Sequence, residues 1–280
     1  MYLKNIFSAK ILVIFVAFSF TNAKPYSTSQ GRNAIIPTTI IAGVTVPNTP
    51  IVQAAQVYAR AHSDNMTFNH VMRSWLFGSI IINSNETLHN TVDPEAYAVA
   101  AILHDLGWDD TGELISEDKR FEVDGAIAAR NFIESTVANG TAAVHDWDEH
   151  RIQLVWDAIA LHATPTISQY KQPLVSMTTA GVFTDLSGPD SDPTHTVTWE
   201  QYDRIKEEFP RLDVGPSVRK IICGFARTKP ATTYDLRGQT LTESGVDTWM
   251  MPYGFRYVDG YAEEAKGHLA IDVANAALPN

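Results

Sequence analysis

Cysteine is almost absent from this chain of 280 residues, in which Cys223 is the only one. A single cysteine excludes an intrachain disulfide and a zinc site built from several cysteines. The sequence also has no internal repeat, no low-complexity segment and no succession of strand patterns, which argues against repeat and sheet-based folds. The fold must therefore depend on its apolar core, and 45% hydrophobic residues suffice for one large core at this length.

Positive charge is scarce as well. The chain has 21 Lys and Arg residues against 32 Asp and Glu residues, a formal net charge of -11. An acidic surface has little non-specific attraction for nucleic acid or for an anionic membrane. We therefore expect a small-molecule substrate as the partner, with no nucleic acid and no membrane once a signal segment is cleaved, while a homo-oligomer is left open.

Long apolar runs are rare, and the one near the N-terminus is short. It covers residues 11–20, fewer than the roughly 20 residues of a bilayer span. Lys4 and Lys10 lie ahead of it, and residues 21–23 (TNA) resemble a cleavage site. The pattern predicts a signal peptide over residues 1–23 and a secreted or secretory-pathway protein, with an uncleaved membrane anchor as the alternative.

The rest of the chain divides into a leader, a helical domain and a tail. Residues 24–50 are rich in Pro, Thr, Ser and Asn without an amphipathic period, so we expect an extended leader. Residues 51–230 carry apolar residues at helical spacing and predict a single all-α domain. Residues 231–280 predict a loop-rich C-terminal extension packed on the same domain, with a short helix from about Tyr261. The predicted helices cover residues 51–61, 67–82, 95–105, 121–137, 146–162, 172–183, 199–209 and 214–226.

The stretch over residues 95–108 (EAYAVAAILHDLGW) is an apolar helical run that ends in two strong metal ligands, His104 and Asp105. An aspartate beside so apolar a run is costly unless a hydrogen bond, an opposite charge or a cation compensates its lost hydration. A cation would compensate both residues together. The alternative is a solvated Asp105 at a helix end and a hydrogen-bonded core histidine.

Two further residues extend this pair to the order His, His-Asp, Asp. His70 lies upstream in a predicted helix, and Asp185 lies downstream beside a glycine-containing turn. Imidazole and carboxylate together suit a divalent first-row metal, and ligands from separated helices leave positions open for water and substrate. The sequence therefore predicts a divalent metal held by His70, His104, Asp105 and Asp185. Zinc is the first expectation, and iron and manganese are the alternatives because the same ligands serve all three.

This order resembles the HD-domain superfamily of metal-dependent hydrolases, and the surrounding motifs resemble its cyanamide-hydratase-like branch. The motifs are NHVMRSW at 69–75, AILHDLG at 101–107, RFEVDGA at 120–126, WDAIALH at 156–162, AGVFTDLSG at 180–188, FPR at 209–211 and KPATTYD at 229–235. The resemblance implies a mostly helical, metal-bound HD-type domain. For the named branch it also implies the addition of water to the nitrile of cyanamide, which gives urea.

Three functions remain open. The first is a metal-dependent lyase (hydratase) or hydrolase that adds water to a small molecule such as a nitrile. The second is a phosphohydrolase, which the wider superfamily implies. Superfamily phosphohydrolases often carry a lysine where Trp108 stands here, and an aromatic ring cannot neutralise a phosphate. The third is a secreted metal-containing binding protein, which would have no need of open coordination positions.

Four residues are the catalytic candidates. Asp105 is expected to accept a proton from water, and His162 to donate one to the substrate, although His162 could instead cap carbonyls at a helix end. Asp157 is expected either to support a ligand histidine or to be solvated. Arg73 is expected to pair with an acid rather than to orient substrate, and Asp124 to cap a helix. Six other histidines are expected on the surface: His62, His89, His145, His150, His195 and His268.

Overall fold

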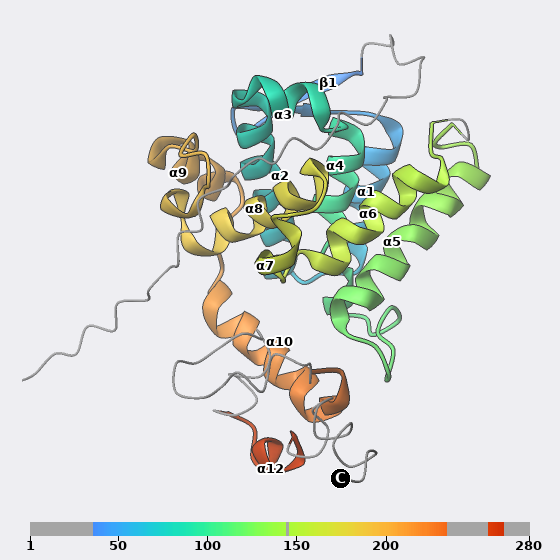
Figure 1. Ribbon diagram of the computed structural model, residues 1–280, viewed down its shortest axis with the longest axis vertical. Helices are drawn as coiled ribbons and strands as arrows, with labels where there is room; N and C mark the ends of the chain where they lie inside the picture. The colour runs from blue at the N-terminus through green and yellow to red at the C-terminus, as the bar shows by residue number, and fades with distance from the viewer. Residues whose placement is uncertain (1–35, 144–145, 234–256, 266–280) are drawn as a thin grey trace, which may run out of the picture.

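Helices make up 67% of the chain that the structure describes, which in this computed structural model comprises residues 36–143, 146–233 and 257–265. The predicted all-α class is confirmed (Figure 1). The predicted signal peptide, residues 24–35 of the predicted leader and most of the predicted tail lie outside the described residues. Among the described helices, none is long and apolar enough to cross a membrane.

The elements follow one another along the chain with short connections. One hairpin comes first, formed by β1 (Thr38–Ile41) and β2 (Val44–Pro47). The α-helices are α1 (Pro50–Ala61), α2 (Asn65–Ser84), α3 (Glu86–Thr91), α4 (Pro94–Leu103), α5 (Phe121–Ala138), α6 (Glu149–Leu161), α7 (Pro165–Ser168), α8 (Pro173–Ser187), α9 (Trp199–Glu208), α10 (Val214–Thr228) and α12 (Tyr261–Ala265). The short 3-10 helices are η1 (Leu106–Trp108), η2 (Pro189–Ser191) and η3 (Pro230–Thr233).

The two helices that lead into the predicted site begin where the sequence indicates. Asp64 caps α2 by accepting a hydrogen bond from the backbone N–H of Thr67 at 2.7 Å. Asp93 caps α4 through the backbone N–H groups of Glu95 and Ala96. Both caps satisfy amide groups that the first turn of a helix leaves without a partner.

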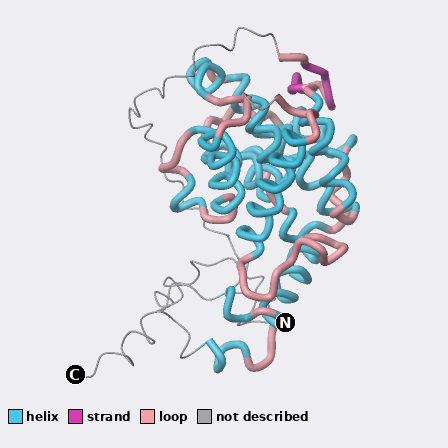
Figure 2. Tube along the Cα trace, turned by 90° about the vertical axis from the view of Figure 1, so that its right-hand side faces the viewer, coloured by secondary structure: helices cyan, strands magenta, loops and turns pink. Residues whose placement is uncertain are grey.

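Helix α4 is the central element of the core. Every residue from Ala96 to Leu103 is buried, so this helix has no polar face. A helix that is apolar all round must be enclosed by other elements. Helices α1, α2, α6 and α8 pack around α4, and Figure 2 shows them as one bundle. The C-terminal end of α4 is thereby fixed inside the molecule.

Helices α2 and α8 lie side by side because glycines allow their backbones to approach. A Cβ atom at Gly181 would lie 2.3 Å from the carbonyl oxygen of Ser74. A Cβ atom at Gly78 would lie 1.8 Å from the hydroxyl oxygen of Tyr97 on α4 and 3.1 Å from the carbonyl oxygen of Met177 on α8. Neither position therefore has room for a side chain, and this close packing brings the polar residues of α2 against those of α8.

The sequence did not predict regular structure within the extended leader, at residues 38–47. They form an antiparallel hairpin whose two-residue turn, Ala42-Gly43, has positive φ at both positions, as a tight hairpin turn requires. Val44 and Val46 are buried in the core, so the hairpin is part of the domain. Strands of four residues are too short to show a clear alternation in the sequence.

Helix α10 extends from the bundle at the end opposite the hairpin (Figures 1 and 2). Its apolar side forms a second, smaller core with residues that flank the predicted site. Phe225 of α10 stacks on Phe121, the first residue of α5, with ring centroids 5.7 Å apart. Helix α10 therefore covers the region in which α4 ends and α5 begins.

Candidate metal centre

Three of the four predicted ligands converge in the interior. His70 comes from the middle of α2, while His104 and Asp105 follow the last turn of α4. Their ligand atoms all lie within 4.8 Å of one another. Asp105 Oδ2 lies 3.2 Å from Nε2 of His104 and 3.4 Å from Nε2 of His70. All three side chains are buried, so the cluster is shielded from bulk water.

His162 joins this cluster from the end of α6. Its Nε2 atom lies 3.4 Å from Oδ1 of Asp105, and its ring centroid lies 4.8 Å from that of His104. Its Nδ1 atom donates a hydrogen bond of 2.6 Å to the carbonyl oxygen of Ile159. His162 therefore combines the two positions predicted as alternatives, because its ring faces the cluster and its Nδ1 atom binds a carbonyl at the helix end.

The ring orientation of each histidine is fixed through Nδ1. His104 donates from Nδ1 to the carbonyl oxygen of Ala101 at 2.8 Å, and His70 donates from Nδ1 to Oδ2 of Asp185 at 2.6 Å. An oxygen of this kind only accepts, so the proton is assigned to Nδ1. In a neutral imidazole, Nε2 then carries the lone pair that a metal ion binds.

Asp185 supports His70 in this structure and does not join the group of three ligands. Arg73 donates from Nε to Oδ1 of Asp185 at 2.6 Å and from Nη2 to Oδ2 at 2.9 Å. The pairing predicted for Arg73 is thus present, and both partners are buried. The direct ligand role of Asp185 stays a prediction, since the structure brings its carboxylate to Nδ1 of His70, on the outer side of the ring.

The ion pair also sets the charge of Asp185. Burial by itself raises the pKa of this carboxyl, but the hydrogen bonds and charges of His70 and Arg73 outweigh it and lower the pKa to about 2. Arg73 additionally donates to the carbonyl oxygens of Phe209 and Pro210, each at 3.0 Å. The guanidinium is therefore occupied by fixed partners.

The two central histidines differ in their proton affinity. Burial lowers the pKa of His104, and the neighbouring Asp105 offsets this only in part. Burial acts in the same direction on His162, but the neighbouring carboxylate of Asp105 outweighs it and the pKa is raised. A neutral His104 suits a metal ligand, whereas a His162 that holds a proton suits a donor.

The chemistry of the cluster fits a divalent cation. Both carboxylate oxygens of Asp105 are buried, and no hydrogen bond reaches either of them within the described part of the chain. Burial acts to raise the pKa of Asp105, but His104 and its neighbours keep it below its usual value, so the group is a carboxylate. A buried carboxylate facing two nitrogen lone pairs is unstable without a positive charge between them. Histidine and aspartate are also suitable ligands for first-row divalent metals.

A family comparison agrees with this geometry. Residues 67–175 match the HD-domain family model. The match supports membership of the HD superfamily, whose members are typically metal-dependent hydrolases. The matched range of the HD domain includes His70, His104, Asp105 and His162 and ends before Asp185. No curated protein matched the chain.

A small cavity of about 20 Å³ opens onto the cluster. That volume is enough for about one water molecule. His70, Asp105 and His162 supply its polar wall. The other lining residues are apolar or aromatic, and they come from η1, α5, α8, α10 and the end of α6: Trp108, Phe121, Ala163, Val182, Phe183, Leu186 and Ile222.

Asp157 is the predicted catalytic residue that the structure does not bring to the cluster. It lies on α6 and is half-buried. Its carboxylate accepts a hydrogen bond from Gln153 at 2.7 Å and pairs with Lys171 at 2.7 Å. The Nδ1 atoms of the imidazoles are already held by other acceptors, so Asp157 does not support a ligand histidine; its carboxylate is bound on α6 and by Lys171 instead of being solvated.

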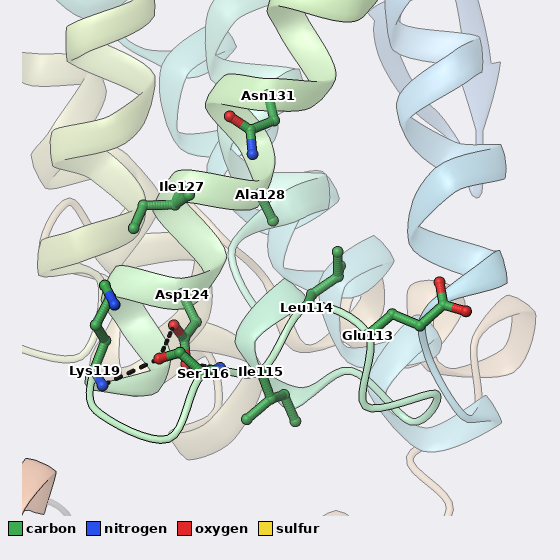
Figure 3. Close-up of a pocket in the computed structure, with 9 residues that line it drawn as sticks. All are labelled: Glu113, Leu114, Ile115, Ser116, Lys119, Asp124, Ile127, Ala128 and Asn131. Carbon is green, nitrogen blue, oxygen red and sulfur yellow. Dashed lines mark hydrogen bonds between the residues drawn. The ribbon is translucent and has the colours of Figure 1, made fainter.

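Asp124 is not a helix cap, contrary to the sequence-based expectation. It lies in the first turn of α5, which has Arg120 as its N-cap residue, and is buried. It accepts hydrogen bonds from the backbone and hydroxyl of Ser116 and forms an ion pair with Lys229 at 2.8 Å. Figure 3 shows the Ser116 contact in a surface cavity of about 310 Å³ between residues 113–119 and α5. The polar groups at the base of that cavity thus bind one another.

Sequence reasoning missed the environment of His62. This residue was expected on the surface, but it is partly buried and its Nδ1 atom lies 3.1 Å from Oδ1 of Asp109. Asp109 also accepts hydrogen bonds from the backbone N–H groups of Thr111 and Leu114. Asp109 directly follows Trp108 in the chain, so this network fixes the loop that leaves the metal centre.

Proposed function

We propose that this HD domain adds water to a small uncharged molecule in a metal-dependent reaction, with a nitrile such as cyanamide as the substrate class. The observation that carries the proposal is the cavity at the cluster. It is small, it is lined by His70, Asp105 and His162, and the rest of its lining is apolar. A space that holds about one water molecule restricts the substrate to a very small molecule, and the apolar lining favours an uncharged one.

The polar groups of the site match the proton transfers that hydration of a nitrile requires. A bound divalent ion would lower the proton affinity of water and polarise the substrate. Asp105 would accept the proton that water loses, since its side chain lines the cavity and its Oδ1 atom lies 3.4 Å from Nε2 of His162. His162 is placed to donate a proton to the substrate nitrogen, which agrees with its raised pKa.

A phosphohydrolase is the second candidate, and the wider family favours it. A phosphate ester would need cationic groups around the metal to balance its charge. No Lys or Arg is among the described residues that line the cavity. The nearest buried guanidinium, that of Arg73, is committed to Asp185 and to backbone carbonyls. These features favour the neutral substrate.

A secreted binding protein is the remaining alternative. A protein that only captured a ligand would not need a histidine with a raised pKa beside a buried carboxylate, so the cluster favours an enzyme. Export through the signal peptide at residues 1–23 stays a prediction, and it would place the substrate outside the cell or in a secretory compartment.

The test is a comparison of product release by one metal-loaded preparation. The protein is loaded with zinc, iron or manganese, its metal content is measured by elemental analysis, and it is assayed in parallel for urea or ammonia from nitriles and amides and for phosphate from monoesters. We expect release of urea or ammonia. His162→Gln is the matched variant, and we expect it to keep its metal and lose turnover by about 10²–10⁴-fold. Phosphate release alone would establish the second candidate, and full metal content without turnover on any substrate would favour the third.

A further inference from the structure

Trp108 has a buried hydrogen-bond donor that nothing in the described part of the chain accepts. Its indole Nε1–H is inaccessible to solvent and lacks a partner. A buried polar group without a partner costs stability, so such groups are rare in folded proteins. Trp75 has the same kind of Nε1–H, but it lies in the apolar core of α2 and does not line the cavity. Only the donor of Trp108 belongs to a residue that lines the cavity at the metal centre.

The backbone and two aromatic rings hold Trp108 in place. A Cβ atom at the preceding residue, Gly107, would lie 1.9 Å from the carbonyl oxygen of Phe121, so η1 packs directly on the start of α5. The indole stacks on the ring of His70, with centroids 6.2 Å apart and an interplanar angle of 18°. It also contacts Phe121, with centroids 5.6 Å apart. The indole ring therefore has little freedom to rotate toward another hydrogen-bond acceptor.

An indole N–H accepts no proton and carries no charge, so it binds a lone pair without neutralising an anion. A lysine at this position would instead attract phosphate. We propose that Trp108 is a specificity-determining residue whose indole N–H binds the nitrogen or oxygen acceptor of a small uncharged substrate, such as a nitrile, amide or urea. The inference rests on the proposed function, because it assigns the substrate class of the same site.

The experiment observes the indole N–H directly. The full chain is labelled with ¹⁵N at its six tryptophan side chains and loaded with zinc, and the indole resonances are recorded with cyanamide, urea or inorganic phosphate. Trp108→Phe identifies the Trp108 resonance, with Trp108→Tyr in reserve if that variant does not fold. We expect cyanamide and urea to shift the Trp108 resonance and phosphate to leave it unchanged. The resonance of Trp75 is the internal control and should not move.

The kinetic variants use the same pair of residues. Trp108→Phe keeps an aromatic ring and loses the donor, so kcat/KM for a nitrile should fall by about tenfold, the effect of one hydrogen bond, while metal content stays unchanged. Trp75→Phe loses an equivalent N–H in the core, and its kcat/KM should equal that of the unmodified protein even if its stability falls.

The outcomes separate this inference from the proposed reaction. Turnover of nitriles with no shift of the Trp108 resonance and no kinetic effect of Trp108→Phe would overturn the inference and leave the reaction standing. A shift with neutral probes in the absence of turnover would support the inference and reject the reaction. A shift with phosphate, or no shift with any probe in an inactive protein, would overturn the role of Trp108 as well.

Discussion

Asp105 is the residue whose burial costs the fold stability and whose carboxylate is central to the chemistry of the site. Its carboxylate is buried without a hydrogen-bond donor in the described part of the molecule, and it faces Nε2 of His70 and of His104. Every other group of the cluster is held by a second contact on its outer side. The cluster is therefore a set of ligands with fixed orientation around one uncompensated negative charge.

Replacement of Asp105 or His104 tests this directly. Asp105→Asn keeps the volume and one oxygen donor but removes the charge, so metal binding should weaken and turnover should be almost lost. His104→Ala removes a ligand, and its metal content should fall furthest. Both proteins should fold, because these side chains lie at the end of α4 and not in its apolar packing. Elemental analysis and turnover are the measurements. Retention of metal and activity in both variants would mean that the end of α4 does not carry the chemistry.

Asp185 distinguishes a metal ligand from a residue that positions one. In the structure it fixes the ring of His70, and the loss of such an outer contact typically weakens metal binding by about 10–100-fold. Asp185→Asn should therefore retain part of its metal when zinc is in excess, whereas His104→Ala should not. Zinc titration of both variants gives the comparison. Equal loss of metal in the two proteins would establish Asp185 as a direct ligand, as the sequence predicted.

The same residue gives a prediction for acid stability. The pKa of Asp185 is lowered from 3.8 to about 2 in the folded protein, so its stabilising effect is fully present above pH 4. That effect is lost as the pH falls from about 4 toward 2, and it amounts to roughly 2 kcal/mol of unfolding free energy. Urea unfolding of the metal-free protein between pH 6 and pH 2.5 measures it. Asp185→Asn should show a weaker dependence on pH in this window, and an equally steep curve would contradict the assignment.

At the scale of elements, the sequence predicted the long helices well. Apolar residues at helical spacing placed the helices that became α2, α5 and α8. The hairpin and the short helices α3 and α7 were not predicted, because four to six residues are too few to show a period.

The candidate site was predictable in its residue types and less so in their contacts. His70, His104 and Asp105 follow from the motif order, and the structure brings them together. That Asp185 binds Nδ1 of His70, and that His162 meets Asp105, depends on the angle at which α8 packs on α2 and α6 packs on α4. A linear sequence does not contain that angle.

Lys229 connects the end of α10 to the loop that precedes α5. Its Nζ atom donates to the carbonyl oxygens of Ser116 and Lys119 and to Asp124, and both charged partners are buried. Lys229→Met should lower the unfolding free energy by about 3–5 kcal/mol, since it leaves a buried carboxylate without its partner. Urea denaturation is the measurement.

Two further variants act as controls for this prediction. Lys229→Met combined with Asp124→Leu removes both charges and should recover much of the loss. Lys206→Ala breaks the exposed pair with Asp203, and it should change stability by no more than about 1 kcal/mol. A large effect at Lys206, or none at Lys229, would show that burial does not decide the strength of these pairs.

At the scale of the whole molecule, the metal centre and the fold should be coupled but separable. The core around α4 is a continuous apolar cluster that includes residues from the hairpin to α9. The candidate ligands lie at one end of this cluster, and their rings are held by hydrogen bonds to the protein itself. The helices therefore do not need the ion in order to form.

Metal removal consequently has two expected results. Chelation should leave the far-UV circular dichroism signal of the helices largely intact, because the apolar core persists. It should also lower the thermal stability, since an ion that binds only the folded state contributes about 4 kcal/mol when its concentration is a thousand times its dissociation constant. Addition of zinc should restore the original melting temperature in the unmodified protein and not in His104→Ala. Loss of the helical signal on chelation would mean that the repulsion between the buried carboxylate and the imidazole lone pairs exceeds the stabilising free energy of the apolar core. The metal would then be required for folding.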